Sequence, residues 1–167
     1  GFPTTHATAD TVADLTGFPA AEIVVCSTGL IGEQLDRPKL LSGVTSAFDA
    51  LSETGGQDAA HAIMTTDTVA KLGSRSSADG WALGGMAKGA GMLAPGLATM
   101  LVVITTDAVL NSEQLDAALR AATRVSFDRL DSDGCMSTND QVTLMSSGAS
   151  QKTPDLAEFT ALLTELC

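Results

Sequence analysis

The chain has 167 residues, about the length of one ordinary domain, and 44% of them are hydrophobic although only 4% are aromatic. Its formal net charge is −11, from nine Lys and Arg residues against 20 Asp and Glu residues. This balance excludes nucleic-acid binding, because phosphate contacts require clustered basic side chains. We expect one compact unit with an aliphatic core.

The three cysteines are Cys26, Cys135 and Cys167, an odd number without CxxC spacing. This pattern predicts neither a disulfide framework nor a zinc site and is typical of a reducing cytoplasm. No signal peptide is expected from the first residues, which show no cationic start followed by an apolar core. The longest apolar run, 91–106, is short and contains Pro95 and glycines, so no membrane helix is expected. We expect a soluble, cytoplasmic protein.

In chain order, the first elements are indicated by apolar spacing and start signals. A helix is predicted over 4–15 and a short buried strand over 21–28. A second helix follows Asp36 and extends to residue 51, and a brief third helix covers 58–66. The chain therefore begins with mostly helical structure.

The second half alternates loops, strands and helices. Residues 72–80 have the composition of a loop. The glycine density after them indicates a backbone that another group approaches closely or that bends through positive φ. The expected elements are a strand over 99–106, a helix over 111–130 capped by Asn111 or Ser112, a loop over 131–140, a strand over 141–148 and a helix over 153–167 that starts with Thr153 as its N-cap. No clean βαβ repeat emerges, which predicts an α+β fold with a mixed sheet layered by helices.

Two ligand motifs are superficially present and are rejected. "GAGMLA" at 89–94 fits a loose dinucleotide template, but Pro95 follows where a helix should open, and no Ser or Thr follows Lys88 as a phosphate loop requires. The loop 129–140 has acidic residues at calcium-loop spacing, but its first ligand position is Arg129. Structural turns explain both segments better.

Nucleophilic chemistry has one candidate. His6 and His61 lie outside any nucleophile motif, whereas Thr99 stands between the small Ala98 and a buried strand. A threonine hydroxyl is activated by its own α-amine once the preceding peptide bond is cleaved, and the pKa of that amine, about 7.7 to 8.0, suits a general base. The alternative is that Thr99 is an ordinary first residue of a strand, where threonine is common.

The chain resembles the ornithine acetyltransferase family, the glutamate N-acetyltransferases of arginine biosynthesis. The resemblance covers the whole chain in family order and rests on these motifs: "VVCSTGLIG" at 24–32, "AIMTTDT" at 62–68, "GGMAKGAGMLAP" at 84–95, "LATMLVVITTDA" at 97–108, "FDRLDSDG" at 127–134, "STND" at 137–140 and "SSGAS" at 146–150.

This resemblance implies an N-terminal-nucleophile enzyme with an αββα layered sandwich that cleaves itself between Ala98 and Thr99. Residues 1–98 would belong to the α chain and 99–167 to the β chain, with Thr99 as the nucleophile. The oxyanion hole would be formed by Thr28 and Gly29.

The same resemblance implies substrate contacts at Thr65, Lys88 and Thr99. An acetyl group would move from N2-acetylornithine to glutamate through an acetyl-threonine, without a metal or bound cofactor. The family includes members that also use acetyl-CoA as a donor and members that do not. Two α and two β chains would associate, and family members extend beyond both ends of this chain.

Two other functions remain open from the residues. An N-terminal-nucleophile aminopeptidase or amidohydrolase would pass the acyl group to water instead of glutamate. A catalytically silent structural segment would use Thr99 only as the start of a strand, and Thr99→Ala would then change stability alone.

Overall fold

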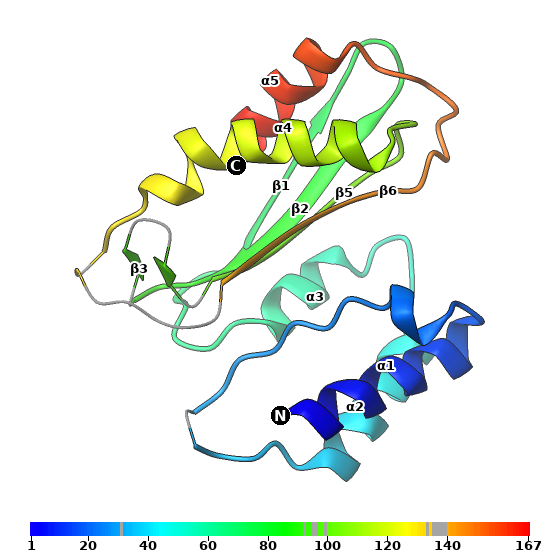
Figure 1. Ribbon diagram of the computed structural model, residues 1–167, viewed down its shortest axis with the longest axis vertical. Helices are drawn as coiled ribbons and strands as arrows, with labels where there is room; N and C mark the ends of the chain where they lie inside the picture. The colour runs from blue at the N-terminus through cyan, green and yellow to red at the C-terminus, as the bar shows by residue number, and fades with distance from the viewer. Residues whose placement is uncertain (31, 92, 95–96, 99, 133, 135–139) are drawn as a thin grey trace. The chain divides into compact units, whose positions relative to one another are not determined.

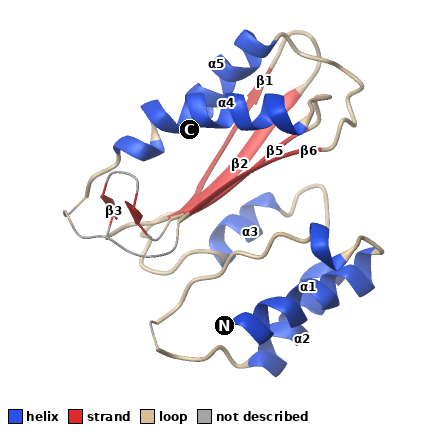
Figure 2. Cartoon of the chain, viewed as in Figure 1, coloured by secondary structure: helices blue, strands red, loops and turns tan. Residues whose placement is uncertain are grey.

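The computed structural model describes residues 1–30, 32–91, 93–94, 97–98, 100–132, 134 and 140–167. The chain divides into two compact units, Gly1–Gly55 and Gly56–Cys167. The first unit is helical, and the second contains both helices and strands (Figure 1, Figure 2). The sequence has no distinct signal for this division, since the glycine pair at Gly55 and Gly56 resembles an ordinary helix end.

The first unit is built on two helices that pack against each other, α1 (Phe2–Thr16) and α2 (Arg37–Asp49). Helix α1 ends at Gly17, whose φ of 79° is left-handed and therefore suits glycine. Helix α2 begins after Asp36, whose carboxylate accepts the N–H of Lys39 at 3.2 Å. Both predicted helices are confirmed, including the Asp36 start signal.

The strand predicted over 21–28 is wrong. A short 3-10 helix covers Ala20–Glu22, and residues 23–30 are irregular. An apolar segment forms a strand only where a neighbouring strand accepts its backbone hydrogen bonds, and no described strand pairs with this one.

The second unit contains a four-stranded sheet of order β1-β2-β5-β6. Its strands are β1 (Lys71–Ser76), β2 (Ala82–Lys88), β5 (Leu101–Thr106) and β6 (Gln141–Ser146). The β1–β2 and β2–β5 pairs are antiparallel, and the β5–β6 pair is parallel. The mixed sheet and the α+β class are thereby confirmed, as are the strands expected near 99–106 and 141–148.

One face of this sheet is covered by two helices, α4 (Ser112–Val125) and α5 (Leu156–Leu166), which lie side by side in Figure 1. The space between the sheet and these two helices contains the hydrophobic core, whose central side chains are fully buried. Its largest side chains are Trp81, Leu83, Ile104, Phe159 and Leu163. Helix α3 (Gly56–Ala62) contacts β1 and β2 from the other side of the sheet.

Local capping explains where the two covering helices begin. Asn111 and Gln114 form a capping box, in which each side chain accepts the other residue's backbone N–H, at 2.9 and 3.0 Å. Helix α5 begins after Asp155, which accepts the N–H groups of Ala157 and Glu158 at 3.0 Å. The predicted Thr153 cap is therefore wrong, because the Asp155 carboxylate satisfies two of the orphan donors at that end.

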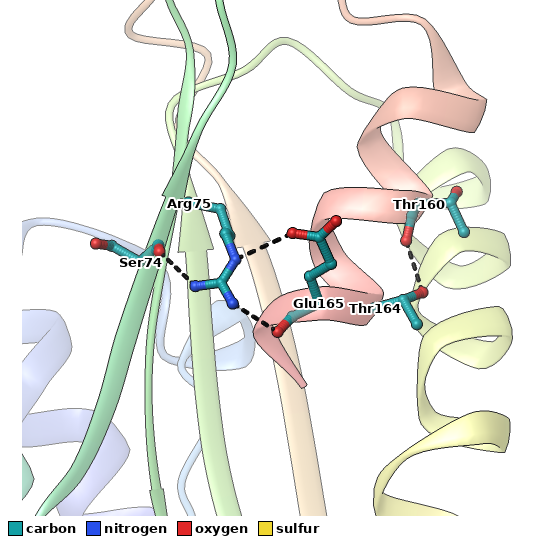
Figure 3. A network of polar contacts seen from close by, with 5 residues as sticks. All are labelled: Ser74, Arg75, Thr160, Thr164 and Glu165. Atoms are coloured by element: carbon teal, nitrogen blue, oxygen red, sulfur yellow. Dashed lines mark hydrogen bonds and ion pairs between the residues drawn. The ribbon is translucent and has the colours of Figure 1, made fainter.

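The loop predicted over 72–80 is also wrong for its first half, because Lys71–Ser76 forms the edge strand β1. Its end is joined to α5 by Arg75, whose guanidinium donates to the Glu165 carboxylate at 3.3 Å and to the Glu165 carbonyl at 3.0 Å (Figure 3). A cation at the last helical turn also complements the helix dipole. Polar residues of an edge strand can face water, so their composition resembles that of a loop.

Glycines let α5 approach the sheet closely. A Cβ added to Gly73 would meet the Leu166 side chain at 3.0 Å, and one added to Gly85 would meet Leu166 at 3.6 Å. Of the glycines in the dense segment, Gly85 is closely approached, Gly84 has no atom within 4 Å of an added Cβ, and Gly89 has a positive φ of 151°. None of the described helices is both long enough and apolar enough to cross a membrane.

Candidate active site

Strand β2 ends at Lys88, one of the expected substrate contacts, and this residue is only 4% exposed. Its neighbour Ala87 packs against the core under α4 and α5, so the alternation of a strand turns Lys88 to the other face, directly opposite Leu101. No described group forms a hydrogen bond or an ion pair with the Lys88 ammonium. Because the stem of Lys88 is buried and its ammonium has no described partner, this position suits an anionic ligand.

The segment that follows α3 carries Thr65, another expected substrate contact. Thr65 is exposed, and its backbone N–H donates to the carboxylate of Asp67 at 3.3 Å. The side chain of Asp67 is itself 1% exposed. The buried carboxylate of Asp67 therefore fixes the backbone of Thr65, while Thr65 itself remains exposed to solvent.

The Asp67 carboxylate accepts two further hydrogen bonds. The backbone N–H of Gly89 donates to it at 2.8 Å, and the ammonium of Lys71 donates to it as an ion pair. Burial raises the pKa of Asp67, but the bonds from Lys71, Gly89 and Thr65 outweigh burial and lower this pKa from 3.8 to about 2. Asp67 thus joins the Thr65 segment to the residue that follows Lys88.

The expected cleavage site falls partly outside the described residues. The two-residue strand β4 (Leu97–Ala98) pairs with β3 (Leu93–Ala94) and ends at Ala98. Thr99, the expected nucleophile, lies outside the described residues. The chain is described again from Met100, whose backbone N–H donates to the Asp140 carboxylate at 2.7 Å.

Met100 is fixed at its carbonyl as well, which accepts the N–H of Gln141 at 2.9 Å. The first residue after Thr99 is therefore held at both backbone groups by the segment that opens β6. Lys88 lies opposite the very next residue, Leu101, in the β2–β5 register. Lys88, Thr65 and the described neighbours of Thr99 all belong to the unit Gly56–Cys167.

Thr28 and Gly29, the expected oxyanion hole, belong to the unit Gly1–Gly55. They lie in the irregular segment after the 3-10 helix, where Thr28 is half-buried and Gly29 is exposed. A Cβ added to Gly29 would touch only Leu35, at 3.9 Å. Their role stays a prediction.

The rejected motifs adopt structures that fit the rejection. Gly89, with a φ of 151°, follows a strand but opens no helix, because the next element is the short strand β3. In the calcium-like loop, Asp131 accepts the N–H of Gly134 at 3.0 Å, as in a polar turn. Asp133 of that loop lies outside the described residues. Among the residues that are described, no group of three His, Cys, Asp or Glu side chains could hold a metal ion.

Asp67 and Lys71 were not among the residues expected at the site. A signal was present, since Asp67 ends the "MTTD" part of a recognised motif and Lys71 follows four residues later. That spacing is ordinary for a surface ion pair, and burial of the carboxylate depends on the approach of Gly89 from β2. Sequence alone does not bring these segments together.

Fold and candidate site together define an α+β protein with a buried position suited to a negatively charged group. The chain belongs to the ArgJ family, whose model matches residues 1–167.

The chain is similar to proteins named "Arginine biosynthesis bifunctional protein ArgJ". The chain is 64% identical over 167 residues to the one from Streptomyces coelicolor, 61% identical to the one from Thermobifida fusca and 54% identical over 169 residues to the one from Bifidobacterium longum. Each match covers 100% of this chain and 43% of the relative. The chain therefore spans less than half the length of these relatives.

Proposed function

We propose that this chain is part of an acetyltransferase of arginine biosynthesis that moves an acetyl group from N2-acetylornithine to glutamate. The observation that carries the proposal is Lys88, a residue that is only 4% exposed and whose ammonium pairs with no described anion, in a chain of the ArgJ family. Both substrates have an α-carboxylate, and a carboxylate forms strong charge-assisted hydrogen bonds with an ammonium. The word "bifunctional" in the relatives' names supports acetyl-CoA as a second donor.

In this mechanism Thr99 is the nucleophile. Its hydroxyl attacks the Ala98 carbonyl, and the resulting ester is hydrolysed, so that residues 1–98 and 99–167 separate into an α part and a β part. The free α-amine of Thr99 then serves as the base. On the described side of the proposed cleavage bond, the Asp140 carboxylate accepts the backbone N–H of Met100.

Acetyl transfer follows in two steps. The Thr99 hydroxyl attacks the acetyl carbonyl of N2-acetylornithine, its proton passes through the α-amine to the leaving amine, and ornithine departs. The amine of glutamate then attacks the acetyl-threonine ester and returns the proton to the hydroxyl. Thr28 and Gly29 would donate hydrogen bonds to the oxyanion in each step, a contribution of about 100-fold or more per donor. No metal or bound cofactor takes part.

We also propose that the four-stranded sheet is one half of an αββα sandwich. Its face opposite α4 and α5 presents apolar side chains, among them Leu72, which is 50% exposed, and Met145, which is 44% exposed. A second sheet from the remainder of the longer protein would bury these side chains. The same longer protein would associate as two α and two β chains.

The test is the intact mass of the protein at the full length of its relatives, compared with Thr99→Ala. We expect the wild type to give two chains separated between Ala98 and Thr99 and the variant to remain whole. Thr45→Ala, which changes an exposed threonine of α2, is the matched control and should cleave as the wild type does.

The same samples are then supplied with N2-acetylornithine, with and without glutamate. Formation of acetylglutamate by the wild type supports acetyl transfer. Release of acetate at the same rate with and without glutamate would instead indicate an amidohydrolase. Cleavage of Thr99→Ala, or equal activity of both proteins, would overturn the proposal.

A further inference from the structure

Asp67 is saturated by groups from three places in the chain. Its Oδ1 atom accepts from Gly89 and Lys71, and its Oδ2 atom accepts from the N–H of Thr65. The side chain is 1% exposed, so water cannot replace a lost partner without rearrangement. The carboxylate is therefore a fixed junction between the segment after α3 and the end of β2.

Two of these donors stand beside expected substrate contacts. Thr65 is itself one such residue, and Gly89 is bonded directly to Lys88. A displacement of the Asp67 carboxylate would move both backbone segments at once. The Asp67 carboxylate therefore links the backbone of Thr65 to the residue that follows Lys88.

Charge balance points to the same role. Lys71 is 43% exposed and forms an ion pair with Asp67, so the negative charge of Asp67 is already compensated. The Lys88 ammonium has no such described partner. The pairing of Asp67 with Lys71 leaves the positive charge of Lys88 for a bound carboxylate.

We propose that Asp67 is a positioning residue, which sets the geometry of Thr65 and Lys88 and thereby the binding of the substrate carboxylate. This inference rests on the proposed function, because Thr65 and Lys88 contact substrate only under that function. Asp67 itself touches no reacting atom.

The experiment uses Asp67→Asn in the protein at the full length of its relatives. The amide keeps the shape of the side chain but loses its charge and turns an N–H group toward one of the three donors. We expect the KM for glutamate and for N2-acetylornithine to rise, with kcat/KM reduced up to about 100-fold, as a misplaced contact requires. Self-cleavage between Ala98 and Thr99 should continue.

Asp58→Asn is the matched control, since Asp58 is an exposed acid on the neighbouring helix α3. Its KM values and its kcat should equal those of the wild type. The number of active sites is counted from the initial burst of ornithine release, so that a partly unfolded sample is not mistaken for a weak binder.

A merely structural Asp67 would give a different result. The burst would shrink and kcat would fall with it, while both KM values stayed at the wild-type level, and this outcome would overturn the inference. If Asp67→Asn does not fold, Lys71→Met takes its place, and the inference then requires a several-fold rise in KM at unchanged burst.

The failure of this inference and the failure of the proposed function give different results. If the wild type cleaves itself and transfers acetyl but the variants keep the wild-type KM values, only this inference is refuted. A wild type without transfer refutes the proposed function and this inference with it.

Discussion

The two ends of the β2–β5 strand pair contain polar groups with very different hydrogen bonding. At one end, Ala82 donates its N–H to the Asp107 carboxylate at 2.7 Å and accepts the Thr106 hydroxyl at 2.7 Å, while Ser150 donates its hydroxyl to the Asp107 carbonyl at 2.7 Å. Polar groups at that end are satisfied by one another. At the other end, Lys88 is buried and no described group pairs with it.

This difference separates a structural network from a binding site. Both ends carry motifs that resemble the family, with "SSGAS" at 146–150 at the first end and "MAKG" at 86–89 at the second. Motif similarity does not distinguish the two ends, but the hydrogen-bond partners of their polar groups do. Saturated groups stabilise the fold, whereas an ammonium that no described group pairs is available to a bound anion.

The largest expected effect comes from Lys88→Met, which removes the positive charge that no described group pairs. Loss of a charge-assisted contact to the substrate should raise the KM for glutamate about 100-fold, equivalent to about 3 kcal/mol. The free energy of unfolding should stay the same or rise, because a buried cation is replaced by an apolar side chain of similar length. Steady-state kinetics and urea unfolding measure the two quantities. A lower stability with an unchanged KM would identify Lys88 as a structural cation.

At the saturated end, Asp107→Ala should have the opposite profile. The backbone N–H of Ala82 would lose its acceptor, and the free energy of unfolding should fall by about 1–3 kcal/mol. The KM for glutamate should not change, because Asp107 lies at the far end of β5 from Lys88. Urea unfolding and kinetics on the same preparation provide the check. A tenfold change in KM without loss of stability would mean that this end also binds substrate.

The smallest effect is a pH dependence of stability at the Asp67 junction. The pKa of Asp67 is lowered from 3.8 to about 2 in the folded state, so its contribution to stability is present above 3.8 and is lost as the pH falls through about 2. The difference in unfolding free energy between the wild type and Asp67→Asn should therefore shrink by about 2 kcal/mol between about pH 5 and about pH 2. Urea titrations across this range measure it. A difference independent of pH would contradict an ionised, hydrogen-bonded carboxylate.

Elements with strong local signals agree with expectation. Asp36 and Asn111 provide cap oxygens for α2 and α4, and the apolar run of β5 suits a buried strand. The errors arose where local signals were ambiguous. Lys71–Ser76 has the composition of a loop but pairs with β2, and the apolar residues 21–28 have no described strand to pair with. Strand formation depends on a partner, which no window of sequence contains.

For the candidate site, the sequence by itself determined which residues to examine and the family to which the chain belongs. Lys88 and Thr65 could be named from their motifs, because side-chain chemistry and spacing are written along the chain. Only the tertiary structure decided that Lys88 is buried with no described partner and that Thr65, Lys71 and Gly89 converge on Asp67. Burial and hydrogen bonding between separate segments are properties of how those segments pack, so they exist only once the sheet and its helices have assembled.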